Sequence, residues 1–106
     1  MISQAMIFSA GLGKRMLPLT KNLPKPLIEI NNKSLLKNNI EKLIESKFKN
    51  IVVNAYHHSE KIVNETKMFK SVKVIVEAER LETGGGLLNA INEKCFREIT
   101  PIVLLN

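Results

Sequence analysis

The sequence predicts an α/β fold in which helices cover both faces of a mostly parallel sheet, as in a Rossmann-like three-layer sandwich. Short apolar runs are typical of strands that are buried on both faces, and helical patterns separate them along the chain. Strands that alternate with helices favour crossover connections and therefore parallel pairing. The runs expected to be strands are residues 5–10, 50–55, 72–77 and 102–105.

The segments between these strands show apolar residues at helical spacing, on one side only. Ser34 and Ser59 stand at the start of two such segments, where a hydroxyl can accept a backbone N–H and cap the helix. Residues 11–26 combine glycine, proline and basic residues, which predicts a loop. Residues 27–30 are expected to be extended, and residues 31–32 to turn the chain. The expected helices are residues 34–48, 59–69 and 84–93.

Length and composition point to one soluble globular domain that covers residues 1–106. Hydrophobic residues make up 44% and charged residues 25% of the chain, so disorder is not expected. The net charge of +6 suits an anionic ligand, but it also fits a solvated lysine-rich surface. A small basic nucleic-acid-binding protein is an alternative. We expect no nucleic-acid partner, because aromatic residues are only 5% and tryptophan is absent, which leaves few platforms for base stacking.

Few residues outside the predicted loop suggest a special function. Cys95 is the only cysteine, so no intramolecular disulfide can form, and we expect a structural thiol in a reducing, cytoplasmic setting. His57 and His58 are expected to be a solvent-exposed pair, since partner ligands for a metal are missing. No apolar stretch is long enough to cross a membrane, and the N-terminus lacks the pattern of a signal peptide.

The loop after the first strand carries the clearest chemical signal. Ligands bind at the carboxyl ends of the strands in open parallel sheets, which is where this loop begins. Gly11 and Gly13 lack side chains, so backbone N–H groups there can approach a phosphate closely. Lys14 and Arg15 follow directly and add a compact charge and a planar fork of donors. This pattern predicts a phosphate-binding loop, although a Gly-x-Gly pair alone also fits a tight turn.

A second cation stands nearby in a rigid segment. Lys25 lies between two prolines, which lower the entropy lost when its side chain is immobilised on a ligand. The loop is not a Walker A loop, because the Gly-Lys-Ser/Thr ending is missing. It is not the dinucleotide fingerprint either, because Met16 replaces the third glycine.

Taken together, these segments resemble the signature of the sugar-1-phosphate nucleotidyltransferases. The matching residues are Gly11–Met16, Pro18–Thr20 and Pro24–Leu27. Glu77–Gly86 resembles the Glu…Leu-Glu-Thr-Gly-Gly-Gly segment of the N-acetylmuramate-1-phosphate uridylyltransferase branch. The mannose-1-phosphate guanylyltransferase branch has a related version, and Asn54 also matches the family. The resemblance covers essentially the whole chain and implies the nucleotide-diphospho-sugar transferase fold.

The resemblance implies a role for each matching residue. Arg15 would hold the triphosphate and stabilise the charge that develops as pyrophosphate leaves, and Lys25 would contact the phosphates at the reacting centre. The three glycines of the second segment would lie near the base, with help from Glu77 or Glu79. The implied nucleotide-binding residues are Ala10, Gly11, Leu12, Gly13, Lys14, Arg15, Lys25, Gly84, Gly85 and Gly86.

The reaction that the resemblance implies is the attack of a sugar 1-phosphate on the α-phosphorus of UTP or GTP, which releases pyrophosphate and uses Mg²⁺. In the family, the strand that matches residues 102–105 leads to an Asp that binds Mg²⁺. Here the chain ends at Asn106 and contains no Asp, so no metal ligand is assigned.

We therefore expect the N-terminal, nucleotide-binding part of a truncated domain, incomplete at its C-terminus, with little transferase activity of its own. Half of a split enzyme, a non-catalytic remnant and a shortened version of a longer enzyme all fit. A complementary C-terminal half or a second copy of the chain is then an expected partner.

Overall fold

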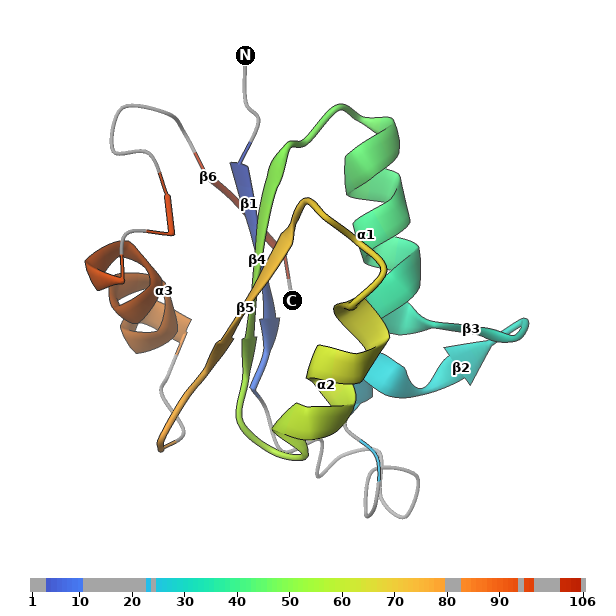
Figure 1. Ribbon diagram of the computed structural model, residues 1–106, viewed down its shortest axis with the longest axis horizontal. Coiled ribbons are helices and arrows are strands. Elements are labelled where there is room, and N and C mark those ends of the chain that lie inside the picture. Colours follow the sequence, from blue (N-terminus) through green and yellow to red (C-terminus); the bar gives the residue numbers. More distant parts are fainter. Residues whose placement is uncertain are drawn as a thin grey trace.

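The computed structural model of the chain describes residues 4–10, 23, 25–79, 83–93, 95–96 and 102–105. Four parallel strands form its main sheet, in the order β5-β4-β1-β6. Helices α1 and α2 cover one face of this sheet, and α3 covers the other (Figure 1). The predicted three-layer sandwich with a parallel sheet is confirmed. The strands are β1 (Gln4–Ser9), β4 (Asn50–Ala55), β5 (Val72–Val76) and β6 (Ile102–Leu105), and the helices are α1 (Leu35–Glu45), α2 (Ser59–Thr66) and α3 (Thr83–Asn92).

The strand order places a topological switch point beside β1. The chain steps from β1 to β4 and β5 in one direction, and then returns past β1 to form β6 on the other side. In open α/β sheets of this kind, ligands bind in the crevice outside the carboxyl ends of the strands, where the order reverses. The crevice expected here lies between the ends of β1 and β6.

Alternation along β1 divides the apolar core into two layers. Ala5 and Ile7 face α1 and α2, whereas Met6 and Phe8 face α3. The first layer is the larger, and Leu36, Ile40 and Ile62 from the two helices are fully buried in it. The second layer is built around Met6, Val52 and Ala90, and it seats α3 on the sheet.

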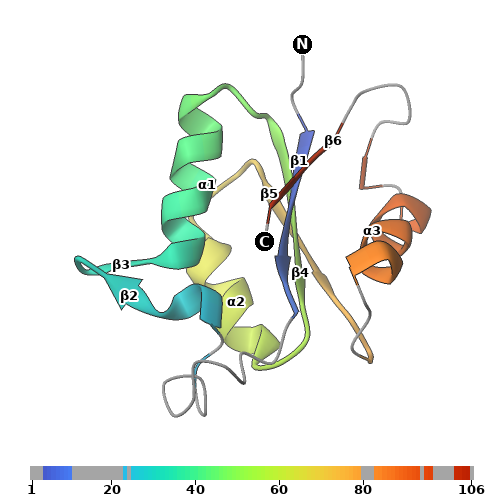
Figure 2. The same ribbon diagram turned by 180° about the vertical axis from the view of Figure 1, so that it is seen from behind.

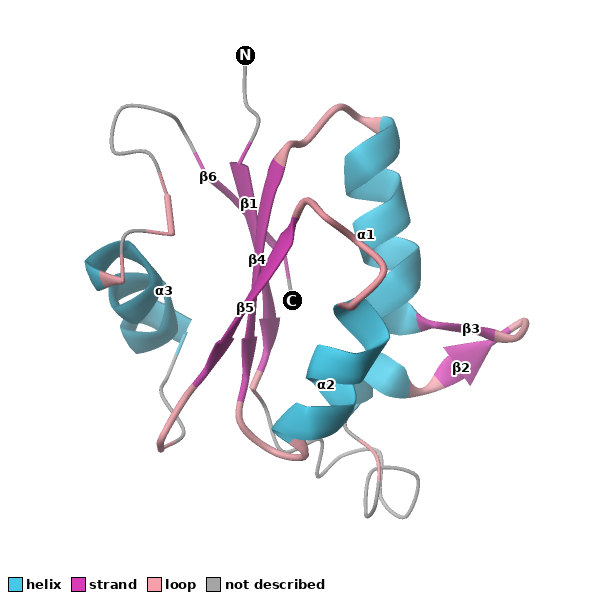
Figure 3. Cartoon of the chain, in the orientation of Figure 1, coloured by secondary structure: helices cyan, strands magenta, loops and turns pink. Residues whose placement is uncertain are grey.

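A short hairpin links the loop segment to α1 (Figure 3). Residues Lys25–Leu27 form a 3-10 helix, η2, and the hairpin follows as β2 (Glu29–Ile30) and β3 (Lys33–Ser34). Asn31 and Asn32 both adopt positive φ, of 56° and 66°, as a type I′ hairpin turn requires. The expected turn is confirmed. The expected extended piece is correct only from residue 29, because η2 includes Leu27.

Helix α1 starts where the sequence predicts and ends earlier. The hydroxyl of Ser34 accepts the N–H of Lys37 at 3.0 Å, which confirms the predicted cap. The helix ends at Glu45, not at Phe48, because Lys47 adopts the left-handed conformation at φ 70°. Phe48 still packs against the core, so the apolar stripe continues beyond the helix that it predicted.

The other two helices shift by a few residues from their predicted bounds. Ser59 is the first residue of α2 and not its cap; His58 occupies the cap position in a left-handed conformation and makes no side-chain cap bond. The helix ends at Thr66, whose carbonyl accepts the N–H of Phe69 at 3.0 Å in a following turn. None of the helices within the described residues is long and apolar enough to cross a membrane.

Replacing Lys47 by glycine is expected to stabilise the fold by about 0.5–1 kcal/mol, because glycine adopts positive φ without the steric cost that a Cβ brings. Lys49→Gly is the matched control: this exposed lysine is not among the positive-φ residues, so the same change should destabilise the fold slightly. Urea denaturation of the two variants checks the difference. Equal destabilisation by both would contradict the assigned conformation of Lys47.

Candidate functional site

The carboxyl ends of β1, β4 and β5 lie at one edge of the sheet, and the predicted site residues that the structure describes follow or flank these ends. In Figures 1 and 2 the three strands run toward the same edge, with the α1–α2 layer and α3 on opposite sides of it. Ala10 follows β1 directly and is buried. Gly11, Leu12, Gly13, Lys14 and Arg15 lie outside the described residues.

Lys25 enters this region on the α1–α2 side of the sheet. It begins η2, which contacts both α1 and α2, and Leu27 in the same turn is buried in the larger core layer. The backbone is further held by a hydrogen bond from the N–H of Ile28 to the carbonyl of Lys25, at 3.1 Å. The side chain of Lys25 is exposed. A buried neighbour thus fixes the backbone, while the cation is exposed and can meet a ligand.

The glycines at the start of α3 have different surroundings. Gly84 is exposed, and a Cβ added there would meet none of the described residues beyond its own helix within 4 Å. Gly86 is buried, and an added Cβ would lie 3.0 Å from Nδ2 of Asn54 and 3.3 Å from Oε2 of Glu77. Gly86 is therefore required for the close approach of α3 to the sheet. Gly85 is half-buried between them.

A buried polar pair supports this edge of the sheet. The side-chain amide of Asn54, near the end of β4, donates to the carboxylate of Glu77 at 3.1 Å, and its oxygen accepts the N–H of Ser9 at 2.7 Å. Both Asn54 and Glu77 are buried. Both residues stand out in the sequence, but their pairing does not. The available signal was an amide near the end of an apolar run, with a glutamate just after the next strand.

The sequence predicts that Glu77 or Glu79 helps to hold the base, and the structure places the two carboxylates in different surroundings. Glu77 is 4% exposed and bonded to Asn54, whereas Glu79 is exposed. The backbone N–H of Glu77 also donates to the carbonyl of Ala55, at 2.8 Å, which extends the pairing of β4 and β5. Burying a carboxylate is costly unless it is hydrogen-bonded, and the bond from Asn54 offsets part of that cost for Glu77.

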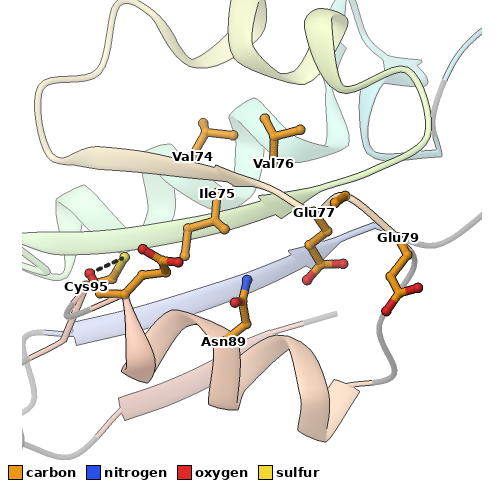
Figure 4. A pocket seen from close by; sticks show the side chains of 9 residues that line it. Val74, Ile75, Val76, Glu77, Glu79, Asn89 and Cys95 are labelled. Atoms are coloured by element: carbon orange, nitrogen blue, oxygen red, sulfur yellow. Dashed lines mark hydrogen bonds between the residues drawn. The ribbon is translucent and has the colours of Figure 1, made fainter.

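A hollow of about 660 Å³ lies beside this pair, between β5 and α3 (Figure 4). Glu77 and Asn89 extend into it, whereas Val74 and Val76 point to the other side of β5. Cys95 lies at the far end of the hollow, where burial raises the pKa of its thiol. A raised pKa disfavours the reactive thiolate, in keeping with the predicted structural role of Cys95.

Within the described part of the chain, no group of three or more His, Cys, Asp or Glu side chains is placed to hold a metal ion. Mg²⁺ prefers clustered carboxylate oxygens, and of the two carboxylates near the strand ends, Glu77 is bonded to Asn54. The described residues therefore do not fit a resident magnesium site. The ring centroids of His57 and His58 lie 4.2 Å apart, with the two rings tilted by 56°, and both residues are half-buried. The expected solvent-exposed pair is therefore wrong in that detail.

Comparison with known proteins matches this geometry to a family. The family model described as "Nucleotidyl transferase" matches residues 4–103. The N-acetylmuramate alpha-1-phosphate uridylyltransferase of Caulobacter vibrioides is 32% identical over 82% of this chain and 39% of its own length. The mannose-1-phosphate guanyltransferase of Yarrowia lipolytica is 32% identical over 97% of this chain and 30% of its own length. The chain thus spans less than half the length of these two relatives.

A solved structure agrees with both the fold and the family. The CTP:phosphocholine cytidylyltransferase of Streptococcus pneumoniae is 31% identical, with a TM-score of 0.68, over 74% of this chain and 34% of that one. The parallel sheet, the switch point and the glycine-rich start of α3 define a Rossmann-like α/β domain. The chain belongs to the nucleotidyl transferase family.

Proposed function

We propose that the chain is the triphosphate-binding part of an enzyme that transfers a nucleoside monophosphate from UTP or GTP to a sugar 1-phosphate, releasing pyrophosphate. The observation that carries this proposal is the glycine-rich start of α3 at the carboxyl ends of β4 and β5, where buried Gly86 rests against Asn54 and Glu77 and Gly84 is exposed. Gly84 has no side chain, so its exposed backbone leaves room for a nucleotide. The names of the relatives supply the reaction class.

The chemistry asks this part of the protein mainly for positioning and charge neutralisation. In an in-line attack on the α-phosphorus, negative charge builds up on the phosphate oxygens and on the departing pyrophosphate. The N–H groups of residues 11–13 would hold the triphosphate, and Arg15 would stabilise the leaving pyrophosphate. Lys25 would reach the reacting phosphates from the exposed side of η2. Mg²⁺ would arrive with the nucleoside triphosphate as part of the substrate.

The α3 segment would hold the base. Backbone N–H groups in the first turn of a helix lack intrahelical partners, so they can donate to the edge of a base. Gly84 is exposed and can be approached closely, while Gly86 holds the turn against the sheet. The relatives are named for uridine, guanosine and cytidine nucleotides, so proteins with this fold differ in the base of the nucleotide that they use.

A half-enzyme that binds nucleotide and a complementary chain is the second candidate. Strand β6 pairs only with β1 among the described strands, and its Leu104 is 46% exposed. An apolar strand edge of this kind favours association with further chain, either from the same enzyme or from a separate subunit. Co-purification with a partner that confers transferase activity would support this candidate.

Pyrophosphate release is the test of the proposed reaction. The chain would be assayed alone and fused to the C-terminal part of the Caulobacter relative. The substrate pairs are UTP with N-acetylmuramate 1-phosphate, and GTP with mannose 1-phosphate. We expect little release from residues 1–106 alone and Mg²⁺-dependent release from the chimera. A soluble, folded chimera that stays silent with both pairs would contradict the proposed reaction.

A further inference from the structure

The side chain of Asn54 connects three segments that are distant in the sequence. Its oxygen accepts the N–H of Ser9 at 2.7 Å, and its nitrogen donates to Oε2 of Glu77 at 3.1 Å. Both bonds are buried. An asparagine amide has one accepting oxygen and one donating nitrogen, so these two partners together define its orientation. Asn54 therefore ties the ends of β1, β4 and β5 into one unit.

The same unit determines where α3 begins. Because an added Cβ at Gly86 would lie 3.0 Å from Nδ2 of Asn54 and 3.3 Å from Oε2 of Glu77, the helix rests directly on the bonded pair. On the other side, Ser9 is joined through Ala10 to the glycine loop. Movement of the Asn54 side chain would thus disturb both the segment before the loop and the first turn of α3.

We propose that Asn54 is a positioning residue. It fixes the segment before the triphosphate-binding loop relative to the glycine-rich start of α3, so that both segments are correctly placed to contact the nucleotide. This inference rests on the proposed function. Asn54 touches neither the phosphates nor the base in this account; it acts through the backbone of Ser9 and through Glu77. Ground-state placement of a charged ligand is sensitive to such support, because the donors must be fixed before the ligand binds.

A matched residue at the opposite end of the same strand provides the control. Asn50 also faces α3, and its side-chain nitrogen donates to Oε1 of Gln4 at 3.1 Å and to the carbonyl of Cys95 at 2.7 Å. It therefore anchors the segment that follows α3 without touching the ligand edge. A substitution at Asn50 measures how much the free energy of unfolding falls when a side-chain bond between the strand and the segment after α3 is lost. A change at Asn54 should report that cost and, in addition, the loss of positioning.

The test exchanges the donor and acceptor of the pair. Asn54→Asp keeps the acceptor for the N–H of Ser9 but places a second carboxylate beside that of Glu77, so the two repel each other. We therefore expect the affinity for MgUTP and MgGTP to fall about tenfold or more. Glu77→Gln alone keeps an acceptor for Asn54 and should change affinity much less. The double variant Asn54→Asp with Glu77→Gln restores a hydrogen bond of reversed direction. It should return the affinity to within about threefold of Glu77→Gln.

Calorimetric titration of the folded variants, with urea denaturation measured in parallel, separates the outcomes. Asn50→Asp should lower stability while leaving nucleotide affinity within about twofold. If Asn54→Asp does not fold, Asn54→Ala is compared with Asn50→Ala in the same way. A wild-type chain that binds neither nucleotide overturns both the proposed function and this inference. A wild-type chain that binds, with Asn54 variants that bind equally well or are not rescued by the exchange, overturns this inference alone.

Discussion

Replacing Arg15 by alanine is expected to weaken binding of MgUTP and MgGTP by about 10- to 100-fold, and replacing Lys25 is expected to do the same. Each substitution removes a charge-assisted hydrogen bond to phosphate, worth about 1.5–3 kcal/mol. The fold should be unchanged, because Lys25 is exposed and the core of its segment is held by Leu27. Isothermal titration calorimetry measures the affinities, and circular dichroism checks the fold.

Charge alone must be separated from contact in this experiment, because the chain carries a net charge of +6 and a triphosphate is attracted to any basic surface. Lys42→Ala is the matched control. It removes the same charge from an exposed position in the last turn of α1, at the opposite end of the sheet. An equal loss of affinity in Lys42→Ala and Lys25→Ala would mean that Lys25 contributes only to the general field.

Gly86→Ala is expected to destabilise the chain relative to Gly84→Ala by about 1–3 kcal/mol, although both changes occur in the first turns of one helix. Alanine favours the helix by up to about 1 kcal/mol at either position, so this gain largely cancels in the comparison. What remains is the steric cost at Gly86, where the new methyl group would press on Asn54 and Glu77. These side chains cannot yield without breaking buried hydrogen bonds.

Chemical denaturation of the two glycine variants, with the m-value monitored, gives the difference directly. Gly84→Ala should be neutral or stabilising, since the added Cβ meets no packed neighbour among the residues that the structure describes. Should the two variants unfold at the same denaturant concentration, the close packing of α3 on the strand ends would be wrong. The proposed support for the base-binding segment would then have no basis.

The strands and their parallel pairing were accessible from the sequence because burial on both faces leaves uninterrupted apolar runs. The bounds of β4 and β6 agree with the prediction, and β1 differs by one residue at each end. The C-terminal end of α1 could not be predicted from the sequence. The helix ends because Lys47 adopts the left-handed conformation, and lysine, unlike glycine, gives no local signal for that conformation.

The position of the candidate site is a prediction from the sequence, and its construction could be predicted only in part. Glycines and cations after the first strand indicate a phosphate site, because the topology brings strand ends to one edge. The sequence could not distinguish the exposed Gly84 from the buried Gly86. Their difference arises from tertiary contacts, because only Gly86 packs against the side chains of Asn54 and Glu77. The bond between Asn54 and Glu77 likewise depends on the alignment of β4 with β5, in which Ala55 pairs with Val76.

The most direct measurement of the central claim is a residue-resolved NMR titration of the labelled chain with MgUTP and MgGTP. The claim is that a nucleoside triphosphate binds at the carboxyl edge of the sheet, between the glycine loop, Lys25 and the start of α3. Saturable shifts should concentrate in residues 9–15, at Lys25 and in residues 83–86, and leave Asn50 at the opposite end unchanged. Saturable shifts that concentrate around Asn50, or no saturable shifts with either nucleotide, would contradict it.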